Sequence, residues 1–258
     1  MPILTLLTDF GTGDYYVAAV KGTVLRLGPQ GVTLVDISHE VPPGDVETGA
    51  FLLGAAALTF PSGTVHLAVV DPGVGSARRM LVVRSRSALF VAPDNGLLTP
   101  FLPAAVSVRS VERSDLFLPG PGQTFHGRDR FAPVAASLLR GEPEAGLGPE
   151  IPDPVRLTFT TPRRSGSRIS GRVLHVDRYG NLVTDIPVGW LPSGDCRAEV
   201  GGFSIARRAS HYAEIPPGEA AMVPGSLGTV ELSMNGEDLA FRWGVPRGAP
   251  VEIVWNGS

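Results

Sequence analysis

Four short polar segments, each containing glycine, hold the residues of this chain whose types and spacing could do chemistry. Their acidic and imidazole side chains can accept or donate protons, and glycine lets the backbone approach a bound ligand closely. The sequence therefore predicts a small-molecule site assembled from several loops. The segments are Thr8-Asp9-Phe10-Gly11-Thr12-Gly13-Asp14, Asp71-Pro72-Gly73-Val74-Gly75, Pro93-Asp94-Asn95-Gly96 and Thr124-Phe125-His126-Gly127-Arg128-Asp129.

The elements that must position these segments alternate between strand and helix patterns over the first half of the chain. Such alternation is typical of βαβ units that build a mostly parallel sheet, in which ligands bind beyond the carboxyl ends of the strands. Asp45 is the expected N-cap of the second helix. The expected strands span residues 3–7, 32–37, 65–70, 80–83, 89–92 and 106–108, and the expected helices span residues 15–27, 45–60 and 131–139.

The composition of the sequence changes after Gly141, where a stretch rich in Pro, Gly and Ser shows no sustained hydrophobic periodicity. Beyond it only short strand patterns follow, at residues 169–176, 182–186, 198–200, 229–234 and 251–254. We therefore expect an α/β protein with two domains. Residues 1–155 form a Rossmann-like domain with a mostly parallel sheet, and residues 165–258 form a smaller all-β barrel domain.

Composition narrows the classes of function. With 43% hydrophobic and 18% charged residues, the chain is expected to be soluble and globular, and its net charge of -3 offers no basic field for nucleic acid. No apolar run approaches the ~20 residues that a membrane-spanning helix needs, and the N-terminal apolar run predicts a strand instead of a signal peptide. The single cysteine, Cys196, fits the reducing cytoplasm.

Each polar segment also has a purely structural interpretation. Pro93-Asp94-Asn95-Gly96 is a strong turn sequence, and a turn is favoured over a ligand site there. Gly11-Thr12-Gly13 lacks the third glycine of a dinucleotide fingerprint. Asp9, Asp71, Asp94 and His126 leave open a dispersed metal site, as in a metal-dependent phosphoesterase. The other histidines show no metal-ligand spacing and are expected to be structural or exposed: His39, His66, His175 and His211.

Five motifs decide between these interpretations when they are taken together. In order and spacing they resemble the adenosine-forming S-adenosylmethionine hydrolases, also called SAM hydroxide adenosyltransferases, which are related to the fluorinase and chlorinase. The resemblance spans nearly the whole chain and implies hydrolysis of S-adenosyl-L-methionine to adenosine and methionine by attack of water on ribose C5′. The motifs are TDFGTGD, VVDPGVGSARR, APDNGLLTP, TFHGRDRFAP and VDRYGNLVTDI.

The resemblance also implies roles for single residues. The Asp, Arg and His that handle the attacking water in that family correspond to Asp71, Arg78 and His126, with Arg79 as the alternative arginine. The carboxylate that grips the ribose corresponds to Asp9. The remaining substrate-binding positions are Asp14 and Asp177 for the methionine amino group, Ser226 for its carboxylate, Asn181 and the Asn235-Gly236 backbone for adenine, and Phe125.

Differences from the halogenases point to water as the nucleophile. Where the fluorinase-like enzymes carry Tyr and Ser, this chain has Asp71 and Gly127, and it has Leu227 where they carry an arginine. The resemblance further implies that no cofactor or metal takes part, and that the chain forms a homotrimer with the site at the subunit interface. A regulatory module that binds adenosine or S-adenosylmethionine without turnover is the non-enzymatic alternative.

Overall fold

The computed structural model describes residues 1–119 and 124–256. The chain divides into two compact units, Met1–Thr158 and Phe159–Ser258. Within the described residues, no helix combines the length and the apolar character that a membrane span requires.

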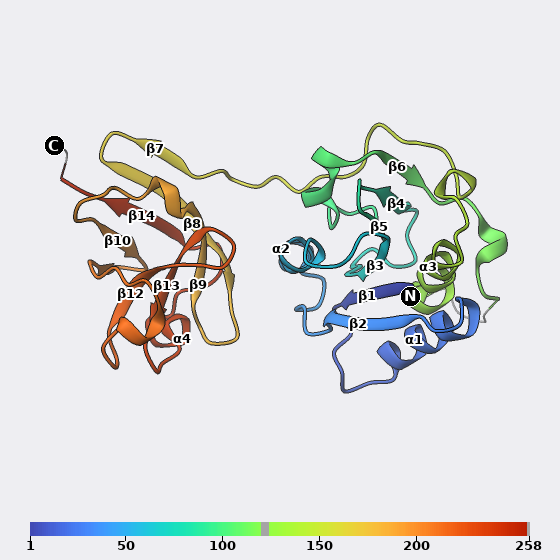
Figure 1. Ribbon diagram of the computed structural model, residues 1–258, viewed down its shortest axis with the longest axis horizontal. Coiled ribbons are helices and arrows are strands. Elements are labelled where there is room, and N and C mark those ends of the chain that lie inside the picture. The colour runs from blue at the N-terminus through green and yellow to red at the C-terminus, as the bar shows by residue number, and fades with distance from the viewer. Residues whose placement is uncertain (120–123, 257–258) are drawn as a thin grey trace. The chain divides into compact units, whose positions relative to one another are not determined.

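A mixed six-stranded sheet forms the centre of the first unit, with the strand order β2-β1-β3-β5-β4-β6 (Figure 1). The first four strands in this order are parallel, whereas β4 runs antiparallel to both of its neighbours. The sheet confirms the expected α/β class. Its strands are β1 (Ile3–Thr8), β2 (Thr33–Ser38), β3 (Thr64–Val69), β4 (Met80–Arg84), β5 (Ala88–Pro93) and β6 (Ser107–Ser110).

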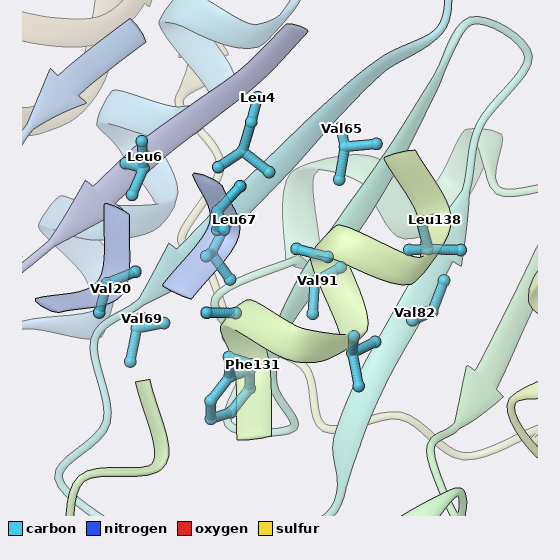
Figure 2. Packing of buried hydrophobic residues seen from close by; sticks show 14 of the residues in the cluster. Leu4, Leu6, Val20, Val65, Leu67, Val69, Val82, Val91, Phe131 and Leu138 are labelled. Atoms are coloured by element: carbon cyan, nitrogen blue, oxygen red, sulfur yellow. The ribbon is translucent and has the colours of Figure 1, made fainter. Parts of the chain in front are cut away.

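Helices cover both faces of this sheet, because the central strands are apolar on both sides. On β1, Leu4 and Leu6 enter the core beneath α1 and α3, and Leu7 enters the core beneath α2. Phe131 lies fully buried in the core that holds Leu4 and Leu6 (Figure 2). The helices are α1 (Tyr16–Leu27), α2 (Val46–Ala57), α3 (Ala132–Leu139), and the short η1 (Thr99–Ala104), η2 (Ser114–Leu116) and η4 (Glu144–Gly146).

Two helix starts matter for the position of the loops. The side chain of Asp45 accepts a hydrogen bond from the Thr48 N–H at 3.1 Å, which confirms the expected N-cap of α2. One π-helical turn, η3 (Gly127–Phe131), directly precedes α3. Such turns are rare and occur often at functional sites. The expected helix at residues 131–139 is thus extended at its start by a turn that follows His126.

The second unit is a curled antiparallel sheet that forms a nearly closed barrel (Figure 1). The order of its strands is β11-β10-β14-β8-β9-β13-β12, with β7 paired to β8, and Arg208 bridges to Met222 of β12. Its core holds apolar residues such as Ile169, Leu232 and Ile253. The strands are β7 (Arg163–Ser165), β8 (Arg168–Val176), β9 (Leu182–Pro187), β10 (Arg197–Val200), β11 (Phe203–Ile205), β12 (Ala220–Pro224), β13 (Thr229–Met234) and β14 (Pro250–Val254).

Three short helices complete this unit, η5 (Val188–Trp190), η6 (Tyr212–Glu214) and α4 (Leu239–Trp243). Asp238 caps α4 by accepting a hydrogen bond from the Phe241 N–H at 2.7 Å, and Gly244 ends it in the left-handed conformation. The sequence patterns did not predict α4, nor the strands β7, β11 and β12.

Candidate functional site

The loops after β1 and β3 lie at one edge of the sheet. The two strands are parallel neighbours, and Thr8 is paired with Val69 in their register. Asp9 directly follows β1, and Asp71 follows β3 after one intervening residue. Because the carboxyl ends of parallel strands meet at the same edge, the two carboxylates lie in one region.

Asp71 forms a two-pronged ion pair with Arg78. The Nε–H of Arg78 donates to Oδ1 of Asp71 at 2.7 Å, and its Nη2 donates to Oδ2. The side chains of Arg78 and Asp71 are only 11% and 5% exposed. A buried bidentate pair of this kind fixes the orientation of the carboxylate as well as its charge.

His126 contacts the same guanidinium. Nη2 of Arg78 lies 3.0 Å from Nδ1 of His126. Arginine can only donate, so Nδ1 is the acceptor and the neutral ring carries its proton on Nε2. Nε2 is buried and has no hydrogen-bond partner among the residues that the structure describes. Burial lowers the pKa of His126, and the positive charges of Arg130 and Arg78 lower it further.

The structure separates the two adjacent arginines. Arg79 turns away from Asp71, since its Nε donates to Oδ2 of Asp94 at 2.7 Å and its Nη1 donates to Asp153 at 2.9 Å. Arg78 is therefore the arginine that contacts both Asp71 and His126.

Asp9 is half-buried beside this group. Its Oδ2 accepts a hydrogen bond from the Gly44 N–H at 2.9 Å. Burial raises the pKa of Asp9 and the negative charge of Asp71 also raises it, against the opposing effect of the Gly44 N–H. Gly44 was not among the predicted site residues, because a backbone donor in the turn Pro42-Pro43-Gly44 has no side-chain signature.

Aromatic rings line the region next to Asp9. The ring of Phe10 lies edge-on to that of Phe125, and Tyr16 contacts both rings. A Cβ atom on Gly127 would lie 3.1 Å from the Phe10 ring, so glycine allows this close approach. Phe125 and His126 are thus brought to the Asp9 loop. Asp14 lies at the exposed end of that loop, where its carboxylate accepts from the Tyr15 N–H at 3.2 Å.

In the second unit, Asp177 and Asn181 form the turn between β8 and β9. Oδ1 of Asp177 accepts from the N–H groups of Tyr179 and Asn181 at 2.8 and 2.9 Å, and its Oδ2 accepts from Nδ2 of Asn181 at 2.8 Å. The Asp177 carboxylate therefore holds the turn and the Asn181 side chain. The side-chain oxygen of Asn181 is not used in these bonds.

The other two predicted residues of this unit lie at opposite ends of β13. Asn235 directly follows the strand, and Ser226 is exposed in the turn before it. Sequence reasoning missed a neighbouring pair, in which the hydroxyl of Tyr212 donates to Oε2 of the buried Glu231 at 2.7 Å. Burial and this bond raise the pKa of Tyr212 to about 12. A lone tyrosine in a loop gives no sequence signal for such a pair.

The residues of the alternative metal site are engaged with arginine or the backbone. Among residues 1–119 and 124–256, no group of three or more His, Cys, Asp or Glu side chains is arranged to hold a metal ion. Asp94 binds Arg79 and the Val155 N–H. Two of the other histidines are buried in the sheet unit: His39 bonds to Thr8, and His66 bonds to Thr5.

Comparison with known proteins decides the family. The model of the SAM hydroxide adenosyltransferase N-terminal domain matches residues 4–148, and that of the C-terminal domain matches residues 171–252. The chain belongs to the SAM hydroxide adenosyltransferase family. The resemblance inferred from the five motifs is thereby confirmed.

Individual relatives agree with this assignment. The chain is 39% identical to an (R)-S-adenosyl-L-methionine hydrolase of Thermus thermophilus, over 96% of this chain and 98% of that one. It is 32% identical to a fluorinase of Actinoplanes sp., over 72% of each chain. The crystal structure of a conserved protein from Thermotoga maritima matches with a TM-score of 0.90 and 34% identity, covering 98% of this chain and 100% of that one.

Proposed function

We propose that this SAM hydroxide adenosyltransferase hydrolyses S-adenosyl-L-methionine to adenosine and L-methionine. The hydrolase relative at 39% identity supports the reaction. The single structural observation that carries the mechanism is the Arg78 guanidinium, which bonds to Asp71 and His126 at once. In this mechanism the three residues are catalytic.

The reaction is a displacement at ribose C5′. The water oxygen bonds to C5′ as the C5′–S bond breaks, the electron pair of that bond stays on sulfur, and the water proton passes to Asp71. Methionine leaves as a neutral thioether, so the departing sulfur needs no acid. A positioned base of this kind contributes about 10²- to 10⁴-fold to a rate.

Arg78 and His126 prepare Asp71 and the water for this step. The two bonds from Arg78 occupy one lone-pair site on each Asp71 oxygen, and each oxygen keeps a second site for the water proton. The neutral His126 presents its Nε2–H as a donor to the water oxygen. Because the site is buried, both hydrogen bonds are stronger than they would be in bulk water.

The remaining site residues hold the substrate in line. We propose that the Asp9 carboxylate accepts hydrogen bonds from the ribose hydroxyls, and that Asn181 and the Asn235-Gly236 backbone bind the adenine edge. Phe125 makes apolar contact with the substrate. Asp14 and Asp177 bind the methionine amino group, and Ser226 binds its carboxylate. Holding water, C5′ and sulfur collinear can supply roughly 7–11 kcal/mol of the barrier.

We also propose that the chain works as a homotrimer without a cofactor, in the cytoplasm. In this assembly the first unit of one subunit and the second unit of a neighbouring subunit share a site. The division of the candidate residues between two units supports this arrangement, since Asp9, Asp71 and His126 belong to the first unit and Asn181 to the second. Ligand sites at domain interfaces are common.

The test is to incubate the purified protein with each sulfonium epimer of S-adenosyl-L-methionine, without halide and with a chelator. We expect equal amounts of adenosine and methionine, formed faster from the (R) epimer that the relative's name specifies. Tight binding of either epimer without products would favour the regulatory module. Activity that depends on added divalent metal would favour the phosphoesterase.

A further inference from the structure

One turn of the first unit is bonded to both ends of the loop that carries Asp71 and Arg78. The loop follows Val70, the first residue after β3, and spans residues 71–79 up to the start of β4. Val70 precedes it, Arg79 ends it, and their carbonyl oxygens accept hydrogen bonds from the consecutive residues Asn95 and Asp94. The two ends of the loop are therefore fixed to each other through a single dipeptide.

Asn95 holds the start of the loop. Its Nδ2 donates to the Val70 carbonyl at 2.8 Å, and its Oδ1 accepts from the Leu97 N–H at 3.2 Å. Both ends of the amide are used, so its orientation is defined. Val70 is fully buried and its carbonyl is one peptide unit from Asp71, so the position of Asn95 bears directly on that of the carboxylate.

Asp94 holds the end of the loop through its backbone and its side chain. Its N–H donates to the Arg79 carbonyl at 3.0 Å, and its Oδ2 accepts from Arg79 Nε at 2.7 Å. Its Oδ1 accepts from the Val155 N–H at 2.8 Å. The carboxylate is 2% exposed and both of its oxygens have donors, as a buried charge requires.

The middle of the loop cannot supply this order by packing. Val74, Gly75, Ser76 and Ala77 are exposed, and Gly75 has a positive φ of 83°. A loop with an exposed, glycine-containing centre loses much conformational entropy when it is ordered. Two turn bonds, from the Val74 and Ser76 N–H groups to the Asp71 and Gly73 carbonyls, lie within the loop. The position of the loop on the sheet depends in addition on the bonds at its two ends.

We propose that Asn95 and Asp94 are positioning residues that fix the Asp71–Arg78 pair through the main chain on either side of it. This assignment rests on the proposed function, in which that pair handles the attacking water. Neither residue touches the reacting atoms. The turn Pro93–Gly96 thus supports the loop that carries Asp71 and Arg78. The bonds from Arg79 and the Val155 N–H account for the buried charge of Asp94 without a metal ion.

The test compares Asn95→Ala with Ser137→Ala. The control removes a similar bond far along the chain, because the buried Ser137 hydroxyl donates to the Val134 carbonyl at 2.9 Å within α3. We measure kcat and KM on S-adenosyl-L-methionine, and hydrogen–deuterium exchange of peptides that cover residues 71–79. For Asn95→Ala we expect kcat to fall about 10- to 100-fold with KM within about twofold, since a displacement near 1 Å can cost that much.

We expect exchange in residues 71–79 to become faster in Asn95→Ala and to stay unchanged in Ser137→Ala. An unchanged exchange rate in that loop, or equal loss of kcat in both variants, would overturn the proposal. If the wild-type chain does not turn over the substrate, the proposed function fails, and the exchange data still decide whether the turn orders the loop. If Asn95→Ala does not fold, the same measurements are made on Asp94→Asn, which keeps the side-chain size and loses the charge. Faster exchange in residues 71–79 and a lower kcat are expected for it too.

Discussion

Nη2 of Arg78 lies 3.0 Å from Nδ1 of His126. Since an arginine has no acceptor, this contact assigns the proton of the neutral imidazole to Nε2. The same guanidinium holds the Asp71 carboxylate through two bonds. One cation thus sets the orientation of a proton acceptor and a proton donor.

Replacing Arg78 should have a much larger effect than replacing Arg79. Arg78→Lys keeps the charge but cannot make two parallel bonds to Asp71 and also reach His126, so we expect kcat to fall roughly 10²-fold. Arg79→Lys leaves those contacts intact, and its kcat should fall by less than about tenfold. Steady-state kinetics of both variants measure this, and equal losses would contradict the assignment of Arg78.

The acid side of the pH–rate profile should report His126. Its Nδ1 must be unprotonated to accept from Arg78, and its pKa lies below the ordinary value of 6.5. We therefore expect the midpoint of the acid limb of kcat/KM to lie below pH 6.5, with activity lost as the pH falls through it.

Arg130→Gln tests the cause of that shift. Arg130 is one of the charges that lower the pKa of His126, so its removal should move the acid limb to higher pH. Arg113→Gln, at an exposed arginine paired with Asp115, is the control and should leave the limb in place. A limb that does not move in Arg130→Gln would show that another group titrates there.

The pH dependence of stability should report His66. This buried ring lies against Phe60 and Phe90, and burial lowers its pKa to about 4. Between pH 4 and 6.5 the unfolded chain binds a proton that the folded chain excludes. The contribution of His66 to the free energy of unfolding is thus fully present above pH 6.5. It is lost as the pH drops toward 4, which lowers the free energy of unfolding by about 3 kcal/mol.

Urea unfolding across this pH range measures the effect. His66→Phe should lose less stability on acidification than the wild type, by about that amount. His211→Phe, at a histidine whose side chain is 63% exposed, should follow the wild type. Parallel curves for the wild type and His66→Phe would contradict the burial argument.

Mixed oligomers test the shared site. In the proposed mechanism, Asp71→Asn should inactivate the first unit of a chain, and Asn181→Ala should impair the second. If each site joins the first unit of one subunit to the second unit of another, a one-to-one mixture of these variants assembled together should regain roughly a quarter of the wild-type sites. No recovered activity, with mixed trimers verified by native mass spectrometry, would place each site within a single chain.

The larger elements of the fold were predictable because their patterns are long. Strands such as β1 and β3 are rich in Ile, Leu and Val, and α2 carries both an N-cap and helical spacing. By contrast, β7 and β11 have only three residues each and α4 has five, which is too few for a period to show. The strand β12 was missed since its sequence, AAMVP, has neither alternation nor β-branched enrichment before its Val.

The residues in contact around Arg78 were named from the sequence, but their geometry was not predictable. The motifs name Asp71, Arg78 and His126 but leave Arg79 as an alternative to Arg78, because the backbone direction decides which side chain turns toward Asp71. The turn at Asp94 and Asn95 was predicted from its composition. Its bonds to Val70 and Arg79 could not be predicted, since they join residues far apart along the chain.

The most direct test of water attack in line with the C5′–S bond uses substrate that carries a chiral deuterium label at C5′, incubated in ¹⁸O-labelled water. In one turnover at high enzyme concentration, we predict adenosine with ¹⁸O at its 5′ oxygen and inverted configuration at C5′. Asp71→Asn should form this product at least about 10²-fold more slowly, while Asp115→Asn, which disrupts an exposed bidentate pair with Arg113, should match the wild type. Retained configuration, or an unlabelled 5′ oxygen in the first turnover, would show that the enzyme itself attacks C5′ and would contradict the account.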